Sequence, residues 1–466
     1  MHLTAFDPPA EQTDELLARV GELVAELLAG ADRAAVTGHP RGQDLVDELL
    51  ASRPGEPVAV EQALDTLRAV LATGDRNAAG GELGYIPGSG LLSAGLAELI
   101  AAVANRYTGL PGFAPAAVAL EQSVLRWMTE RFGLPERAQA VLTSGGSMAN
   151  LAALVAARER LASGAPQLAT LYVGEHAHAS VRKAARIAGL RGEHVRVCPT
   201  ADGLRLDPEA VRVAIKQDLA DGLRPIAVVG AAGTTNTGAV DPLPALAEVA
   251  RQTGVWFHVD AAYGGFFQLT ERGRHRLAGI EQADSITLDP HKSLFLPFGT
   301  GALVVRERGD LVHAFNEDAD YLRDTAEDLD ALPDFSAISP ELTRAWRGLR
   351  LWLPLAVHGV DAFRAALDRA LDLAELAGRA LEDCPHVEVV GAPDLSIVTF
   401  RGPGDDAAQD ALLRAVNADG RVRLSSTRID GRVTLRLVVL SHRTTTEHVA
   451  VALERITRAV SDGSRR

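Results

Sequence analysis

The sequence predicts an α/β protein, with a mostly parallel seven-stranded sheet in a large domain and a smaller α+β domain at the C-terminal end. Three observations support this prediction. The 466 residues are too many for one small core. Short β-branched segments alternate with helical stretches from about 91 to 350, which is typical of a parallel sheet covered on both faces. After 351 the order changes to one long helix, four strands and a closing helix.

The first part of the chain, 1–90, is rich in alanine and leucine and is expected to be helical. Its apolar spacing predicts helices over 14–30 and 60–74. This segment is too small and too one-sided to form a domain by itself, so we expect it to pack on a partner subunit.

The large domain, 91–350, contains seven expected strands. They fall at 140–144, 169–174, 194–199, 225–232, 255–262, 284–289 and 301–306. Sheets of this kind bind ligands beyond the carboxyl ends of their strands. In the small domain, 351–466, we expect a long helix, four strands and a last helix over 359–384, 386–391, 395–402, 422–431, 432–440 and 445–460.

The composition excludes several classes of partner. The chain carries 47 Lys+Arg against 61 Asp+Glu, a net charge of -14, and an acidic surface repels nucleic acid and anionic membranes. No apolar run reaches the roughly 18 residues that span a bilayer, and the first residues lack a signal-peptide pattern. Cys198 and Cys384 form no CxxC pair and are expected to be reduced. We therefore expect a cytoplasmic protein without a metal site.

Lys292 is the first residue that points to a specific chemistry. It follows a predicted strand in the stretch LDPHKSLF, beside His291. Burial lowers the pKa of a lysine and makes its amine a nucleophile toward an aldehyde. An ordinary loop lysine is the alternative, and the motifs around Lys292 favour the first interpretation.

Asp260 ends a predicted strand in HVDAAYGG. A carboxylate among apolar neighbours needs a partner. A protonated pyridine nitrogen would serve, because the carboxylate keeps the ring cationic and the cationic ring withdraws electrons. A helix N-cap is the alternative role for this side chain.

A glycine-rich turn, Ser144 to Ser147, joins another predicted strand to a helix. Its two glycines, Gly145 and Gly146, let the backbone approach an anion, and the helix N-terminus offers unpaired amides. We expect a single phosphate here. The turn is neither GxGxxG nor a Walker P-loop, which makes nucleotide binding less favoured.

Two more segments follow strands. His178, in EHAHAS, opens a helix, where an imidazole could stack on a flat ring and exchange protons, although His176 competes for this role on spacing. Thr234 and Thr235 precede a turn closed by Asp241. The threonine hydroxyls could bond a ligand or simply shape the turn.

In this order, the five segments resemble the group II pyridoxal-phosphate decarboxylases, which include aromatic amino acid, histidine, glutamate, cysteine sulfinate, aspartate and diaminobutyrate decarboxylases. The resemblance covers about 80–445, and HVDAAYGG together with PHK is its most specific part. It implies the aspartate aminotransferase type I fold, pyridoxal 5'-phosphate as cofactor, and a homodimer with shared active sites. The implied reaction converts an L-amino acid to its amine and carbon dioxide.

The resemblance also implies roles for single residues. Lys292 is similar to the lysine that holds the cofactor as a Schiff base, with His291 just before it. Asp260 matches the partner of the pyridine nitrogen, and His178 matches the histidine that stacks on the ring. The phosphate-binding turn matches Gly145, Gly146 and Ser147. Ala262 matches the residue packed under the ring, and Thr235 matches a threonine near the cofactor.

The stretch 315–336 is acidic and poor in apolar spacing, as a lid would be, and the family carries a catalytic loop at this place. Its tyrosine corresponds to Tyr321 and is thought to return a proton to the carbon that loses carbon dioxide. In related aldehyde synthases this tyrosine is phenylalanine, or the stacking histidine is replaced. Tyr321 and His178 together therefore favour simple decarboxylation.

The sequence departs from the family pattern around the substrate. Asp289 stands where many relatives carry asparagine, and its role is open. The stretch GYIPGSG is less aromatic than its counterpart in the aromatic decarboxylases, where the partner subunit also supplies a phenylalanine. The candidates for substrate binding are Tyr85, Ile86, Pro87, Arg106, Leu110 and the small-domain Arg436.

Two alternatives remain open at this stage. One is another pyridoxal-phosphate reaction on the same fold, such as decarboxylation with oxidative deamination to an aldehyde, or other lyase chemistry. The other is a cofactor-binding protein without turnover, which the joint presence of Lys292, Asp260, His178 and Tyr321 argues against.

Overall fold

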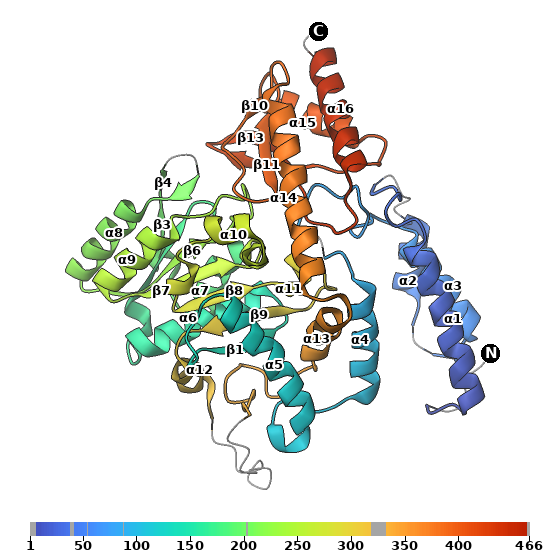
Figure 1. Cartoon of the computed structure of the whole chain (residues 1–466), viewed down its shortest axis with the longest axis horizontal. Coiled ribbons are helices and arrows are strands. Elements are labelled where there is room, and N and C mark those ends of the chain that lie inside the picture. The colour runs from blue at the N-terminus through green and yellow to red at the C-terminus, as the bar shows by residue number, and fades with distance from the viewer. Residues whose placement is uncertain are drawn as a thin grey trace.

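The computed structural model describes residues 6–37, 42–53, 55–86, 88–201, 204–317 and 332–463. A seven-stranded sheet forms the centre of the large domain, in the spatial order β1-β9-β8-β7-β6-β2-β3 (Figure 1). Its strands are β1 (Gln139–Thr143), β2 (Ala169–Gly174), β3 (Val195–Cys198), β6 (Arg224–Ala231), β7 (Trp256–Ala261), β8 (Ser285–Leu288) and β9 (Gly301–Val305).

The sheet is mostly parallel, as predicted. Only β9 runs against its neighbours β1 and β8, while the other pairs are parallel. All seven expected strands are present. Every residue of β2, β7, β8 and β9 is buried. Strands buried on both faces read as continuous apolar runs, which is why β-branched segments located them in the sequence.

Helices pack on this sheet and cover it. The helix α6 packs across β6, β8 and β9, whereas α8 and α9 pack on β6 and α5 packs on β1. The helices that cover or flank the sheet are α5 (Pro115–Arg131), α6 (Gly146–Ala162), α7 (Ala179–Ile187), α8 (Pro208–Ala220), α9 (Leu243–Thr253), α10 (Glu271–Arg276), α11 (Pro290–Ser293) and α12 (Arg308–Phe315). A short hairpin, β4 (Thr200–Ala201) and β5 (Arg205–Leu206), lies beside them.

The small domain has a four-stranded antiparallel sheet in the order β10-β11-β13-β12. Its elements are α14 (Val360–Glu382), β10 (Glu388–Val389), β11 (Ile397–Arg401), α15 (Asp406–Asn417), β12 (Ser425–Ile429), β13 (Arg432–Val438) and α16 (Thr446–Gly463). This agrees with the predicted α+β domain, although α15 was not predicted. A preceding helix, α13 (Gly348–His358), packs on α4 (Leu92–Ala104) and α5. The domain limits at 90 and 350 stay predictions.

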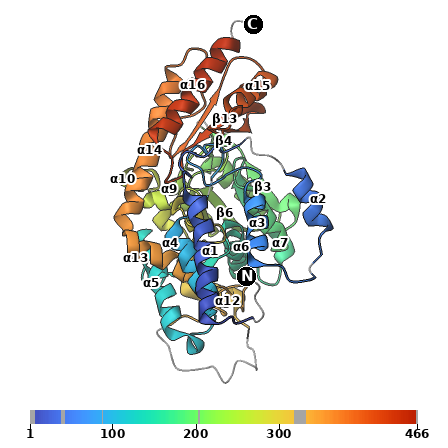
Figure 2. The ribbon, with the colours of Figure 1, turned by 90° about the vertical axis from the view of Figure 1, so that its right-hand side faces the viewer.

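The N-terminal segment forms α1 (Ala10–Leu28), α2 (Gln43–Ala51) and α3 (Val60–Leu71), which lie along one side of the molecule (Figure 2). Predicted helices correspond to α1 and α3, while α2 was missed. Within these helices, only Leu23 and Leu64 are buried. The stretch before α4 joins the small domain, where Leu83 N donates to Arg423 O (2.9 Å) and Val438 N donates to Leu83 O (2.8 Å).

Candidate active site

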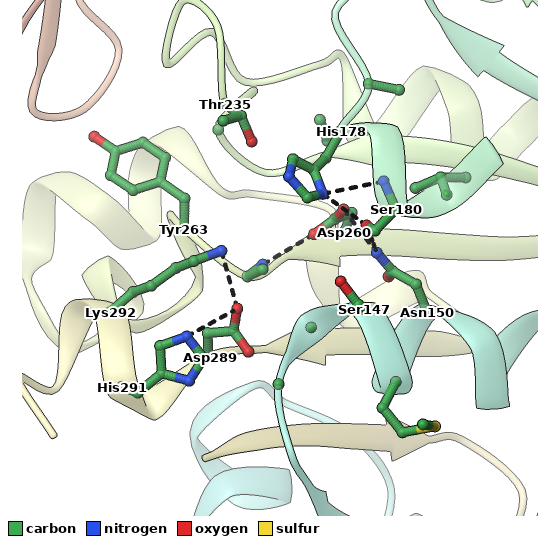
Figure 3. A pocket seen from close by; sticks show the side chains of 18 of the residues that line it. Ser147, Asn150, His178, Ser180, Thr235, Asp260, Tyr263, Asp289, His291 and Lys292 are labelled. Carbon is green, nitrogen blue, oxygen red and sulfur yellow. Dashed lines mark hydrogen bonds and ion pairs between the residues drawn. The ribbon is translucent and has the colours of Figure 1, made fainter. Parts of the chain in front are cut away.

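A cavity of about 430 Å³ opens beyond the carboxyl ends of the sheet strands. Parallel strands end at the same edge, so the polar residues that follow β2, β6, β7 and β8 meet there with the turn after β1 (Figure 3). Of the predicted site residues, the cavity wall contains Gly145, Gly146, Ser147, His178, Thr235, Asp260, Ala262, His291 and Lys292.

Lys292 lies on α11, one short turn after β8. Its Nζ is 2.9 Å from Asp289 Oδ2, and its side chain keeps 21% of its surface exposed. Asp289 is buried, and its Oδ1 has no hydrogen-bond partner among the described residues. The carboxylate of Asp289 therefore holds the Lys292 amine at the cavity wall. The sequence left the role of Asp289 open, and the structure shows this ion pair.

Asp260 occupies the end of β7, where it lies beside Asn150 of α6 (Figure 3). Its Oδ1 accepts a hydrogen bond from Ala262 N (3.1 Å), and its Oδ2 accepts one from Asn150 Nδ2 (3.0 Å). The two donors therefore fix both oxygens of the Asp260 carboxylate in place. An anion fixed in this way can face a cationic ring nitrogen.

His178 caps the N-terminus of α7. Its Nδ1 accepts from Ser180 N (3.3 Å) and lies 2.7 Å from Ser180 Oγ. Burial lowers the pKa of His178; the Asp260 carboxylate opposes this shift and the Lys292 ammonium adds to it. A neutral ring whose Nδ1 accepts two donors carries its proton on Nε2. Figure 3 shows this second ring nitrogen turned away from Ser180.

The turn after β1 is shaped for close backbone approach. Gly145 has φ 153°, which favours glycine, and α6 begins at Gly146. A Cβ on Gly146 would lie 2.9 Å from Asp289 Oδ2 and 3.1 Å from the Cβ of Ala262. The first helical bonds run from Met148 N and Ala149 N to Gly145 O. The earlier amides of α6 therefore remain available to an anion at the cavity.

His291 lies beside Asp289 at the base of the cavity. Its Nδ1 donates to Thr300 O (2.7 Å), and its Nε2 lies 3.7 Å from Asp289 Oδ2. Burial lowers the pKa of His291, with the Asp289 carboxylate acting in the opposite direction. The carbonyl of Thr300 thus fixes Nδ1 of His291 as a donor, and the other ring nitrogen, Nε2, faces the carboxylate of Asp289.

Arg436 supports the site from the small domain. Its Nη2 donates to Thr235 O (2.7 Å), its Nε to Asn236 O (2.9 Å), and its Nη1 to Ser425 Oγ (3.0 Å). Thr234 Oγ1 pairs with Thr237 Oγ1 at 2.7 Å, so this hydroxyl shapes the turn. The guanidinium does not line the cavity in the described structure; it fixes the Thr235 turn against the small domain.

The remaining substrate candidates are not gathered around this cavity. Tyr85 is 56% exposed, Leu110 is buried, and neither of them nor Ile86 belongs to the described cavity wall. His176 and Arg106 also lie outside that wall. Pro87 and Tyr321 lie outside the described residues.

Sequence reasoning missed the contribution of Asn150. It lies in the first turns of α6, is 1% exposed, and contacts both Asp260 and Ser180. The available signal was an amide within the apolar run SMANLAAL, because a buried amide requires partners. Tyr263 and Phe298 also line the cavity and were not predicted.

Residues 55–402 match the pyridoxal-dependent decarboxylase conserved domain. The chain belongs to this family. It is 34% identical over 382 residues to the aromatic-L-amino-acid decarboxylase of Bacillus atrophaeus, covering 80% of each chain. It is 30% identical over 425 residues to the phenylacetaldehyde synthase of Arabidopsis thaliana, covering 86% of each. A crystal structure of Oryza sativa TDC with PLP and tryptamine matches with a TM-score of 0.92 and 26% identity, covering 98% of this chain and 100% of that one.

Membership of this family makes the protein a carboxy-lyase that acts on amino acids with pyridoxal 5'-phosphate as cofactor. The cavity fits this cofactor. Lys292 would offer an amine to its aldehyde, Asp260 an anion to its ring nitrogen, and the turn at Gly145 amides to its phosphate. Within the described residues there is no group of three or more metal-ligating side chains and no helix long and apolar enough to cross a membrane.

The glycine turn yields a direct prediction. Gly146→Ala should weaken pyridoxal 5'-phosphate binding roughly 5- to 100-fold, because the new methyl group forces the turn away from Asp289 and Ala262. Absorbance titration of the cofactor-free protein measures this affinity. Gly309→Ala on α12, where a Cβ meets nothing within 4 Å, is the matched control. Equal affinity in both variants would show that the turn does not bind the phosphate.

Proposed function

We propose that this enzyme removes the α-carboxylate of an L-amino acid and releases the primary amine and carbon dioxide, with the cofactor attached to Lys292. The observation that carries the proposal is the meeting of three groups in one cavity: the Lys292 amine, the Asp260 carboxylate and the His178 imidazole. In the net reaction the Cα–carboxylate bond breaks, carbon dioxide leaves, and one proton is added to Cα.

Pyridoxal 5'-phosphate, when bound, supplies an electron-withdrawing ring that stabilises the negative charge left at Cα. The residues of the chain hold and shape this chemistry. Lys292 would hold the aldehyde carbon through Nζ, and Asp260 would keep the ring nitrogen protonated. The amides at Gly146 and Ser147 would bind the phosphate, while His178 would cover one face of the ring.

The proton that returns to Cα requires a donor in the cavity. His178 carries its ring proton on Nε2, as its contacts to Ser180 indicate. We assign the donor role to Tyr321, assisted by His178, on the resemblance of this chain to the family. A phenol is a suitable donor in a site that excludes water.

The alternative product is an aldehyde, and one relative of this chain is a phenylacetaldehyde synthase. That reaction consumes dioxygen and releases ammonia and hydrogen peroxide with the aldehyde. The presence of both His178 and Tyr321 in the sequence favours the amine.

Two free, buried cysteines support a cytoplasmic location for the reaction.

A panel of aromatic, acidic and basic L-amino acids, with their D-enantiomers as controls, tests the proposal. We expect at least one L-amino acid to release carbon dioxide and amine in a 1:1 ratio without peroxide, as the net reaction requires. In the same assay Tyr321→Phe should lower the amine yield. Part of the carbon dioxide should then be released together with ammonia and peroxide. Amine formation at the parental rate in this variant would refute the role of Tyr321.

We also propose that the enzyme is a homodimer. The helix α4 exposes a run of large apolar side chains, Leu92, Leu96, Leu99, Ile100 and Val103. The helices α1 to α3 expose a second apolar set, Leu17, Leu27, Val46, Leu49, Leu50, Leu67, Val70 and Leu71. Apolar faces of this extent mark interfaces, and a twofold axis lets each subunit cover the other. Substrate candidates outside the cavity, such as Leu110, would then serve the partner's site.

Light scattering after size exclusion tests this arrangement. The parent protein should have twice the 49.2 kDa mass of one chain. Leu96→Glu should shift the protein toward the monomer, because a buried charge without a partner is costly. Leu219→Glu on α8 alters a similarly exposed leucine away from these faces and should remain dimeric. A parent protein with the mass of a single chain would contradict the proposal.

A further inference from the structure

A line of buried polar side chains runs along β7 to the carboxylate of Asp260. Trp256, His258 and Asp260 alternate along the strand and therefore share one of its faces. Ser285 is the register partner of His258 on β8, and Asn150 reaches the same face from α6. All five are at most 9% exposed.

The contacts form an unbroken chain. Trp256 Nε1 donates to Ser285 Oγ (2.7 Å), and Ser285 Oγ lies 2.7 Å from His258 Nδ1. His258 Nε2 lies 2.9 Å from Asn150 Oδ1, and Asn150 Nδ2 donates to Asp260 Oδ2 (3.0 Å).

The two ends of the chain fix the direction of every bond. An indole N–H only donates, and a carboxylate only accepts. Asn150 donates its amide N–H to Asp260, so its amide oxygen accepts from His258, which carries a proton on Nε2. A neutral His258 ring then accepts at Nδ1 from the hydroxyl of Ser285, and the same hydroxyl oxygen accepts from Trp256.

The protonation of His258 agrees with this direction. Burial lowers the pKa of His258 to about 4, while the Asp260 carboxylate opposes the shift. The ring is therefore neutral near pH 7 and holds a single proton, as the chain requires. Thr287 Oγ1, at 3.4 Å, is the other polar atom near His258 Nε2.

A branch of the chain reaches His178. Asn150 Nδ2 also donates to Ser180 Oγ (2.9 Å), so the hydroxyl proton of Ser180 is free for His178 Nδ1 at 2.7 Å. Asn150 therefore supports two site residues at once: it donates to the carboxylate of Asp260 and, through Ser180, keeps the ring proton of His178 on Nε2 (Figure 3).

We propose that Asn150 and His258 are positioning residues that hold the Asp260 carboxylate in place at the cavity and keep His178 in its Nε2–H form. The inference rests on the proposed function, because it assigns Asp260 to the ring nitrogen of the cofactor. The chain orients and does not conduct protons, since the indole of Trp256 at its far end cannot accept one.

Two variants of equal shape separate this role from a merely structural one. Asn150→Thr keeps one hydroxyl that can accept from His258 and donate to Asp260, whereas Asn150→Val can do neither. The readout is the ¹⁵N chemical shift of the ring nitrogen in holoenzyme loaded with ¹⁵N-labelled pyridoxal 5'-phosphate, without substrate, from about pH 6 to about pH 9.

We expect the parent and Asn150→Thr to keep the ring nitrogen protonated over this range. In Asn150→Val the nitrogen should lose its proton at a pH lower by about one unit or more, because Asp260 loses the donor that holds its carboxylate in place beside the ring nitrogen. With the preferred amino acid, kcat of Asn150→Val should fall roughly 10- to 100-fold, with KM changed less than about threefold.

The same nitrogen titration in Asn150→Val and Asn150→Thr would overturn the inference. Should Asn150→Val not fold, Ser285→Ala carries the test: it removes the donor to His258 Nδ1 and should shift the titration in the same direction, and Ser285→Thr should restore it. An unchanged titration in Ser285→Ala would then refute the chain. Failure of the parent protein to bind the cofactor at all would refute the proposed function instead.

Discussion

The carboxylate of Asp260 lies at the end of a strand whose residues are all buried. A polar side chain in such surroundings needs hydrogen-bond partners. Ala262 N and Asn150 Nδ2 supply them, one to each oxygen. The helix α6, which packs across the sheet, brings Asn150 to the carboxylate and its own N-terminus to the cavity.

The wall of the cavity at Lys292 depends on the close approach of the glycine turn's backbone to the side chain of Asp289. Asp289 pairs with Lys292 at 2.9 Å and lies directly under the glycine turn. A Cβ at Gly301 would come within 2.5 Å of Gly145, and one at Gly146 would touch Asp289. The site thus places the amine of Lys292 and the glycine turn together, with the carboxylate of Asp260 on the same cavity.

Much of this could be predicted from the sequence, because buried parallel strands leave continuous apolar runs and their carboxyl ends meet at one edge. This reasoning predicted Lys292, Asp260 and His178 at that edge, and all three line the cavity there. Asn150 and His258 were not, since a polar residue inside an apolar run shows no partner until the fold brings one. Leu110 lies away from the cavity within its own chain, which a single sequence cannot reveal.

The attachment of the cofactor to Lys292 is the central claim, and the chain contains only two other lysines, Lys183 and Lys216. Borohydride reduction of the holoenzyme, followed by digestion and mass spectrometry, identifies the lysine that carries the cofactor. The structure predicts a reduced adduct on Lys292, where the amine faces the cavity beside Asp289. An adduct on Lys183 or Lys216, with Lys292 unmodified, would contradict the account.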